Sequence, residues 1–257
     1  VTLAVYFLGP TVAKVLLYYG LAPLIARGRP VRLTAELPAL PEVAPSQVAL
    51  NVGLSPGTRL WLKERFLQTA DEGLERRTRF LLDWRMPFTC LASGLLELVE
   101  LRQPPGATPS RSVTLSNEAD PSVELALVTL PAGSALVLRP SYLIGAAAGA
   151  GERLVVRRRW QLFRWQSWVS LQFRFFEFVG PCRLIVAGSR GVRAERLDDP
   201  GAARRTNQDS TIGFTPNLDY LPARAETFWG YYRGMNPLFD DLVAGRGFFL
   251  CQQVSVA

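Results

Sequence analysis

The sequence contains no histidine, and this absence removes the commonest side chain of acid–base catalysis and metal binding. Without imidazole there is no Ser–His or Cys–His nucleophile, no histidine general base and no histidine ligand for zinc or iron. Cys90, Cys182 and Cys251 are too few and too scattered for a thiolate metal site or a disulfide scaffold. We therefore expect no catalytic residues, no cofactor and no metal ion.

Lysine is almost absent as well. Lys14 and Lys63 are the only lysines among 29 basic residues, so the other 27 are arginines, against 22 acidic residues. The net charge of +7 favours a surface suited to phosphates, anionic lipids or acidic partners. Otherwise the composition is ordinary: 257 residues, 48% apolar and 20% charged, predict one large or two small folded domains and exclude wholesale disorder.

Residues 1–30 form an apolar N-terminal arm. Residues 1–26 carry one charge, Lys14, and a group of arginines follows at Arg27, Arg29 and Arg32. The length and the flanking charges fit a membrane span, whereas Gly9-Pro10 and Lys14 argue against an unbroken one. Two interpretations stay open: an arm that packs on the body or on a partner, and an arm that contacts a membrane.

The remainder of the chain divides into a linker and a β domain. Residues 31–46 are proline-rich, which predicts an extended linker. Residues 47–257 show short alternating runs such as VELALV at 123–128, broken by Gly, Pro, Asn and Asp, and these runs predict strands. Two helices are expected within this domain, a modest one at 69–82 and a turn or two at 236–243.

A motif recurs at a spacing of 76 residues. Residues 57–62 (GTRLWL) match 133–138 (GSALVL), and 209–214 (DSTIGF) match more weakly in the same register. A second element, 180–186 (GPCRLIV), resembles 245–251 (GRGFFLC). Each unit of a few strands is too small to bury both of its faces, so we expect three units to pack around a common pseudo-threefold core.

Strand and turn segments of these units resemble a known family. They are 123–134 (VELALVTLPAGS), 138–143 (LRPSYL), 178–184 (FVGPCRL), 213–220 and 245–249. They are similar to the altered-inheritance-of-mitochondria family of bacteria and mitochondria, whose fold is related to the tryptophan RNA-binding attenuation protein (TRAP-like). The resemblance covers residues 123–254 and only faintly 55–100. Where the family commonly has Gly-Pro-Gly, this chain has Gly180-Pro181-Cys182 and Gly245-Arg246-Gly247.

The resemblance implies an all-β, TRAP-like, pseudo-threefold sandwich or barrel without established catalytic residues. It also implies a mitochondrial protein that acts in inner-membrane organisation and complex integrity. Because the matching residues belong to strands and turns, the resemblance speaks for fold more than for chemistry.

The most unusual segment is 153–174, which holds six arginines and no acid. Aromatic residues are interleaved with these arginines. The candidate partner- or RNA-binding residues are Arg153, Arg157, Arg158, Arg159, Trp160, Arg164, Trp165 and Trp168. Arginine forks bind phosphates and aromatic rings stack on unpaired bases, which suits RNA. The same mixture suits a protein interface, an anionic membrane, or a solvated arginine face whose aromatic residues point into a β core.

Other candidate motifs have structural explanations. The glycine run 145–151 lacks the Gly-Lys-Ser/Thr sequence of a phosphate-binding loop and indicates a flexible loop. The paired acids Asp198-Asp199 and Asp240-Asp241 indicate a turn and a polar helix turn. The aromatic segment 220–239 predicts either a loop that closes the open end of the β body or a docking patch.

These observations predict a non-enzymatic structural or accessory subunit of a mitochondrial multiprotein assembly. We expect it to associate with an inner-membrane complex, on the matrix side of that membrane or in the matrix. Its partners would be other protein subunits, with residues 1–30 in contact with the membrane. The alternative is an RNA-contacting protein of a mitochondrial ribonucleoprotein, such as the mitoribosome, with the arginine-rich segment on the RNA.

Overall fold

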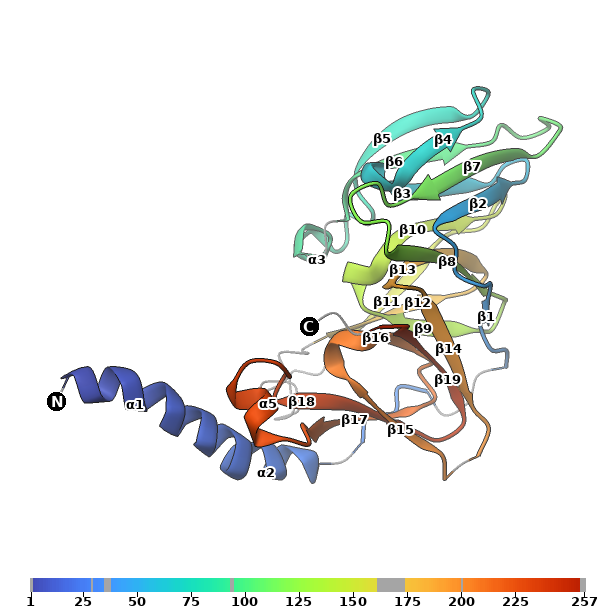
Figure 1. Cartoon of the computed structure of the whole chain (residues 1–257). Helices are drawn as coiled ribbons and strands as arrows, with labels where there is room; N and C mark the ends of the chain where they lie inside the picture. The colour runs from blue at the N-terminus through green and yellow to red at the C-terminus, as the bar shows by residue number, and fades with distance from the viewer. Residues whose placement is uncertain are drawn as a thin grey trace.

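The computed structural model describes residues 2–28, 30–34, 38–92, 95–160, 174–199 and 201–254. Antiparallel β-strands make up most of its regular structure, which confirms the expected all-β class. The strands form a stack of sheets, and an N-terminal helix extends away from one end of that stack (Figure 1). The linker is not wholly irregular, because β1 (Glu42–Val43) pairs with β8 at the edge of a sheet.

In the part of the chain that the structure describes, the strands after β1 fall into three consecutive blocks of six. The first block contains β2 (Ala49–Leu54), β3 (Arg59–Lys63), β4 (Leu67–Ala70), β5 (Glu75–Leu81), β6 (Leu96–Arg102) and β7 (Arg111–Ser116). The second contains β8 (Val123–Leu130), β9 (Ala135–Leu138), β10 (Leu143–Ala148), β11 (Val155–Trp160), β12 (Arg174–Val179) and β13 (Cys182–Ser189). The third contains β14 (Val192–Leu197), β15 (Ala203–Asn207), β16 (Thr211–Phe214), β17 (Asp219–Arg224), β18 (Phe239–Ala244) and β19 (Gly247–Gln252).

The strands pair in the same order in every block. The sixth strand pairs with the first and the third, and the fifth pairs with the second and the fourth. A 3₁₀ turn separates the second strand from the third in each block: η2 (Glu64–Phe66), η3 (Pro140–Tyr142) and η4 (Gln208–Ser210). Each block therefore consists of two three-stranded sheets, which belong to different layers of the stack.

Neighbouring blocks are joined edge to edge. The third strand of a block pairs with the second strand of the block before it, as β10 pairs with β3 and β16 with β9. The two joints fuse three-stranded sheets into larger ones and produce four layers. Their strand orders are β2-β7-β4, β1-β8-β13-β10-β3-β6-β5, β11-β12-β9-β16-β19-β14 and β15-β18-β17.

Three apolar cores fill the spaces between the four layers. Adjacent residues of one strand point into different cores: Leu60 faces the core below the first layer, while Trp61 faces the central core. In the same way Leu136 lies in the central core and Val137 in the core that touches the last layer. The inner strands are therefore buried on both faces, whereas the outer strand β2 alternates between exposed and buried residues.

Glycine permits the two joints between blocks. A Cβ atom on Gly145 would lie 2.6 Å from the carbonyl oxygen of Trp61, and one on Gly213 would lie 2.4 Å from that of Val137. Both glycines directly follow the irregularity at the start of their strand, and Thr69 holds the corresponding position in β4. β4 has no partner in another block among the described residues, so a Cβ is tolerated there.

The last block also ends in a protected edge. The second strand of this block, β15, carries Arg204 and Arg205 where β3 and β9 are apolar. Arg204 pairs with Glu195 at 3.2 Å and Arg205 with Asp240 at 2.9 Å. Charged residues on an edge strand oppose further strand pairing, which accounts for the end of the series of blocks at β15.

Several expectations need correction. The third unit was placed in the wrong register: residues 211–214 form the third strand of their block, not the second. The 3₁₀ turns begin at Glu64, Pro140 and Gln208, which are 76 and 68 residues apart, because the turns after β12 and β13 are shorter than those after β6 and β7. A closed threefold body would require a third joint, in which β4 of the first block pairs with β15 of the third. These two strands lie at the edges of separate sheets, so the pseudo-threefold arrangement is not confirmed.

The two helices expected inside the β domain are wrong. Residues 69–82 belong to β4, β5 and the turns around them, and residues 239–243 belong to β18. β5 lies at a sheet edge with most of its side chains exposed, so its polar sequence does not alternate. In β18 the alternation is present in the buried residues Phe239, Asp241 and Val243, but a buried aspartate in the middle hides it.

Candidate membrane anchor and basic cleft

The N-terminal arm is one continuous helical rod made of α1 (Thr2–Val15), a π-helical segment η1 (Leu16–Leu21) and α2 (Ala22–Ala26). The expected break at Gly9-Pro10 is wrong, because Pro10 lies inside α1. A proline in an apolar helix removes one backbone hydrogen bond without ending the helix when neighbouring groups compensate. The stretch from Leu8 to Ala26 is long and apolar enough to cross a membrane, and most of it is exposed.

One face of the arm is pinned to the third block. The hydroxyl group of Tyr18 donates to the carbonyl oxygens of Ala225 at 2.8 Å and Glu226 at 3.0 Å. The Nζ atom of Lys14 donates to the carbonyl oxygen of Tyr232 at 2.5 Å. Ala22 and Ile25 pack with Phe239 in a small apolar cluster of their own. The C-terminal half of the rod is therefore part of the folded body.

The aromatic segment 220–239 forms the docking surface for the arm. Its short helix α5 (Phe228–Tyr232) packs the ring of Phe228 against Tyr18 with centroids 5.3 Å apart, and Tyr231 stacks on Tyr18 at 6.0 Å. Trp229, on the same helix, is largely exposed. In Figure 1, α5 lies against the rod at the point where the rod leaves the β body. Of the two expectations for this segment, the docking patch describes what these contacts do.

A second face of the rod is apolar and exposed. Leu8, Val12, Val15, Leu16 and Tyr19 follow one another at helical spacing, and Leu16 is 65% exposed. Such a stripe is unfavourable in water, so a membrane or a partner is expected to cover it. The N-terminal part of α1 extends beyond the β body with no other element beside it in the view of Figure 1.

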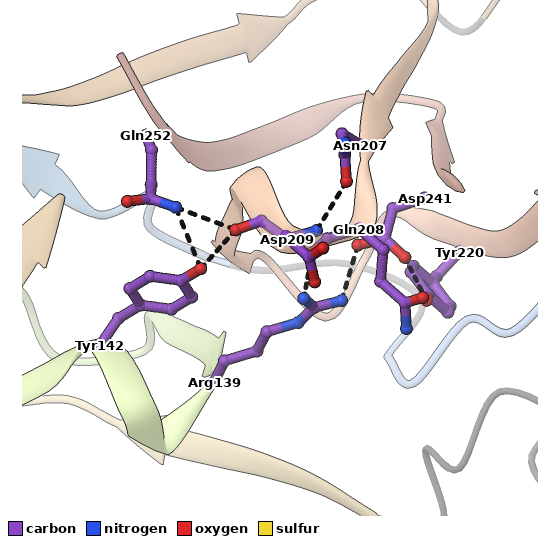
Figure 2. A network of polar contacts seen from close by, with 8 residues as sticks. All are labelled: Arg139, Tyr142, Asn207, Gln208, Asp209, Tyr220, Asp241 and Gln252. Atoms are coloured by element: carbon purple, nitrogen blue, oxygen red, sulfur yellow. Dashed lines mark hydrogen bonds and ion pairs between the residues drawn. The ribbon is translucent and has the colours of Figure 1, made fainter. Parts of the chain in front are cut away.

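A buried polar network joins the second and third blocks (Figure 2). Arg139, which follows β9, donates to the Asp241 carboxylate at 2.8 Å and to the carbonyl oxygen of Gln208. The hydroxyl group of Tyr220 donates to the other oxygen of Asp241 at 2.6 Å. Burial raises the pKa of Asp241, while Arg139 and Tyr220 oppose that rise.

The rest of the network lies around the 3₁₀ turn of the third block. The amide of Gln252 donates to the carbonyl oxygen of Asp209 at 2.9 Å and to the hydroxyl oxygen of Tyr142 at 3.1 Å, and Tyr142 donates to the same carbonyl. Asn207 accepts from the backbone N–H of Asp209 at 3.0 Å. These contacts fix the position of the third block, and with it the N-terminal rod, so the network acts as a structural joint.

A cleft with a volume of about 600 Å³ lies between the first two blocks. It is lined by Arg59, Trp61, Arg79, Leu82, Asp83, Arg85, Glu152, Arg153, Leu154, Val155 and Val156. Its four arginines outnumber its two acids. The acids accept backbone N–H groups, Asp83 from Arg85 and Glu152 from Gly149, both at 2.9 Å. The cleft therefore has an excess of positive charge.

Trp61 lies on the wall of this cleft, close to two guanidinium groups. The Arg79 guanidinium is 5.4 Å from the centroid of its ring and that of Arg59 is 6.0 Å away, both within the range of cation–π attraction. Arg79 also lies 3.9 Å from Glu100. The Trp61 Nε1–H is buried without a hydrogen-bond partner among the described residues. This wall of the cleft therefore carries the guanidinium groups of Arg59 and Arg79, which are attracted to the Trp61 ring.

The structure places only part of the arginine-rich segment. Arg153 lines the cleft, and Arg157 is an exposed residue of β11. The backbones of Arg158, Arg159 and Trp160 continue β11, where they pair with β12. Arg164, Trp165 and Trp168 lie outside the described residues. Sequence reasoning missed Arg59, Arg79 and Arg85, because they come from the first block and only the fold brings them to Arg153.

The three thiols are buried and unpaired as disulfides. Burial raises the pKa of Cys182 to about 12. Among the described residues no group of three cysteine, aspartate or glutamate side chains could hold a metal ion.

No protein-family model matches the chain, and no curated protein matches its sequence. The fold is similar to that of a protein from Streptococcus pyogenes in a crystal structure, with a TM-score of 0.55 and 10% sequence identity. The match covers 84% of this chain and 94% of the streptococcal chain. At this identity the likeness concerns the fold alone, so the resemblance to the altered-inheritance-of-mitochondria family stays a prediction.

Proposed function

We propose that this protein is a non-enzymatic structural subunit of a membrane-bound assembly, with its N-terminal rod in the bilayer and its β stack at the membrane surface. The observation that carries the proposal is the two-faced rod. One face is fixed to the third block by Tyr18 and Lys14, while the other presents an exposed apolar stripe. Because the rod is fixed to the third block, insertion of its apolar face into a membrane would hold the β stack at the membrane surface.

The location is proposed on separate grounds. The family resemblance implies a mitochondrial protein that acts in the organisation of the inner membrane, so the assembly is proposed to be an inner-membrane complex. The lack of histidine in the sequence supports a structural role over a catalytic one. Four stacked sheets, with a charged edge strand at one end of the series, suit a rigid scaffold.

The membrane part of the proposal is tested by placing charges on the exposed stripe. Leu8→Lys combined with Leu16→Lys adds two lysines at largely exposed positions of the rod. A lysine at the centre of a membrane helix opposes insertion by about 3 kcal/mol, and Leu16 lies near the middle of the stretch from Leu8 to Ala26. We expect the double variant to leave the membrane fraction on alkaline carbonate extraction, while Val48→Lys, at an exposed apolar position of the β body, stays there. A double variant that remains in the membrane fraction contradicts the proposal.

The alternative is an RNA-contacting subunit, which the excess of arginine in the cleft favours. Sedimentation of the native protein from a mild-detergent lysate, with and without ribonuclease, separates the two functions. A heavy peak that collapses on RNA digestion supports the alternative. A heavy peak indifferent to ribonuclease supports the membrane complex, and a light peak in both conditions contradicts a role as a subunit.

A further inference from the structure

A second apolar surface lies far from the N-terminal rod in the sequence. The segment from Phe80 through α3 (Pro87–Ala92) is half buried: Met86 and Cys90 belong to the central core. Leu81 and Leu82 are buried in the same core, whereas Phe88 is 81% exposed and Trp84 68% exposed. Because its inner residues are fixed in the core, the segment holds these rings outside the body in a defined position.

Four residues make up this surface, which we call the α3 patch: Phe80, Trp84, Phe88 and Leu91. The rings of Phe80 and Trp84 lie 6.3 Å apart. Four exposed large apolar side chains on one short segment are unfavourable in water and indicate a covered site. Tryptophan and phenylalanine are also the side chains that favour the boundary between lipid headgroups and acyl chains.

The basic cleft borders the α3 patch directly. Leu82, Asp83 and Arg85 line the cleft, while Trp84 between them belongs to the patch. Arg85 and Arg153 are exposed at the cleft, and Arg59 and Arg79 lie deeper, against Trp61. Guanidinium groups bind phosphate oxygens in a bidentate manner. Apolar rings beside arginines match the layered chemistry of an anionic bilayer, in which phosphates lie next to hydrocarbon.

The direction of the patch agrees with that of the rod. In Figure 1, α3 projects from the β stack on the same side as α1 and α5, to the left of the view, whereas β2 and β14 lie on the opposite side. A membrane that receives the rod on this side would also meet α3. RNA would use the arginines but leaves the exposed apolar rings unexplained.

We propose that the α3 patch and the arginines of the basic cleft form a second contact with the anionic bilayer that holds the N-terminal rod. This inference rests on the proposed membrane anchorage. The patch inserts at the headgroup boundary, and Arg85 and Arg153 bind lipid phosphates. Two contacts, one on the third block and one on the first, fix the orientation of the β stack on the membrane.

A fluorescent label on the patch tests the proposal in the full chain reconstituted into vesicles. The native thiols are buried, so an introduced cysteine is labelled selectively. An environment-sensitive fluorophore is attached at Phe88→Cys or at Leu91→Cys, the second of which keeps Phe88 in place. Val48→Cys is the control, because Val48 is exposed and directly precedes β2, a strand that lies on the opposite side in Figure 1. The vesicles contain phosphatidylcholine, alone or with an equal part of phosphatidylglycerol, and a lipid with a nitroxide near the top of its acyl chain.

In the anionic vesicles we expect the labels on the patch to shift to shorter wavelengths and to be quenched by the nitroxide, while the Val48 label does neither. Arg85→Gln with Arg153→Gln should abolish the difference between anionic and neutral vesicles. The matched control, Arg193→Gln with Arg196→Gln on β14, should keep that difference, because these exposed arginines lie on the opposite side. Glycerol phosphate in solution should leave the emission of the labels unchanged, since it offers phosphate without a bilayer.

Flotation of the same samples after an alkaline wash separates two kinds of failure. If the protein floats with the vesicles and the labels on the patch stay in water, the second contact is refuted and the anchor stands. If the protein does not float, both proposals are refuted. Labels that respond to single-stranded RNA but not to vesicles also overturn the inference, because the cleft would then bind nucleic acid.

Discussion

Replacing Gly145 by alanine should weaken the joint between the first and second blocks. The new Cβ would lie 2.6 Å from the carbonyl oxygen of Trp61, on the neighbouring strand β3. Non-bonded heavy atoms approach without repulsion only to about 3.5 Å, so one strand has to move by about 1 Å. That oxygen belongs to the backbone of a paired strand between two packed cores, so no flexible side chain can turn aside to make room.

The magnitude follows from comparison with a second glycine. Gly53 lies in β2, and a Cβ there would meet nothing within 4 Å. Both substitutions reduce the freedom of the unfolded chain, which stabilises a protein by about 0.4–1 kcal/mol, and this gain cancels between them. The difference in the free energy of unfolding between the two variants is therefore the strain at Gly145, and strain in an overpacked interior costs about 1–3 kcal/mol. We expect Gly145→Ala to be less stable than Gly53→Ala by about 3 kcal/mol, the upper end, because the obstacle is backbone.

Thermal unfolding of the full chain in mild detergent, followed by near-ultraviolet circular dichroism, measures this difference. A loss of about 3 kcal/mol should lower the midpoint by roughly 6–12 °C relative to Gly53→Ala. Gly213→Ala, at the second joint, should behave like Gly145→Ala, since its Cβ would lie 2.4 Å from the carbonyl oxygen of Val137. Equal midpoints for Gly145→Ala and Gly53→Ala would refute the description of the joint.

Three further predictions concern the arm, a buried amine and the thiols. Tyr18→Phe removes the one hydroxyl hydrogen that is shared between the carbonyl oxygens of Ala225 and Glu226 and holds the rod, at a cost of about 1 kcal/mol. Trypsin should cleave the segment after the rod faster in this variant, but not in Tyr19→Phe, whose side chain is exposed. Burial, assisted by Arg65, lowers the pKa of Lys63 to about 8 from 10.5, so the folded state binds fewer protons between these values. The wild type should therefore gain stability relative to Lys63→Met as pH rises from 8 to 10.5, and parallel pH profiles in urea titrations would contradict this. Because Cys182 has a pKa of about 12, iodoacetamide at pH 8 should leave it unmodified until urea unfolds the protein, and fast labelling of the native chain would disprove its burial.

The strands of the second block were the most predictable part of the fold. In 123–128 the alternation of apolar and other residues is clear, and the turn 131–134 contains proline and glycine. The turn at Gly180-Pro181 was matched correctly with that at Gly245-Arg246, since both separate the fifth and sixth strands of a block. The third unit was misplaced because short matches of sequence do not reveal a change of turn length between repeats.

The candidate site was only partly predictable. An excess of arginine near Arg153 was visible in the sequence, and Arg153 does line the basic cleft. Its partners Arg59, Arg79 and Arg85 lie on or next to strands of the first block, and no local pattern connects them to Arg153. The α3 patch was also missed, because Trp84 and Phe88 stand beside buried residues and resemble core residues in the sequence.

By itself the sequence determined the all-β class, the apolar arm and the excess of arginine, because strand alternation, hydropathy and charge are properties of neighbouring residues. Tertiary structure alone decided which edges meet, and so produced four layers where the repeat predicted a threefold body. The strand joints, the cleft and the side of the body on which the α3 patch lies depend on contacts between residues far apart in the chain. The need for glycine at position 145 is likewise visible only in the folded chain, where the paired strand β3 leaves no room for a Cβ atom.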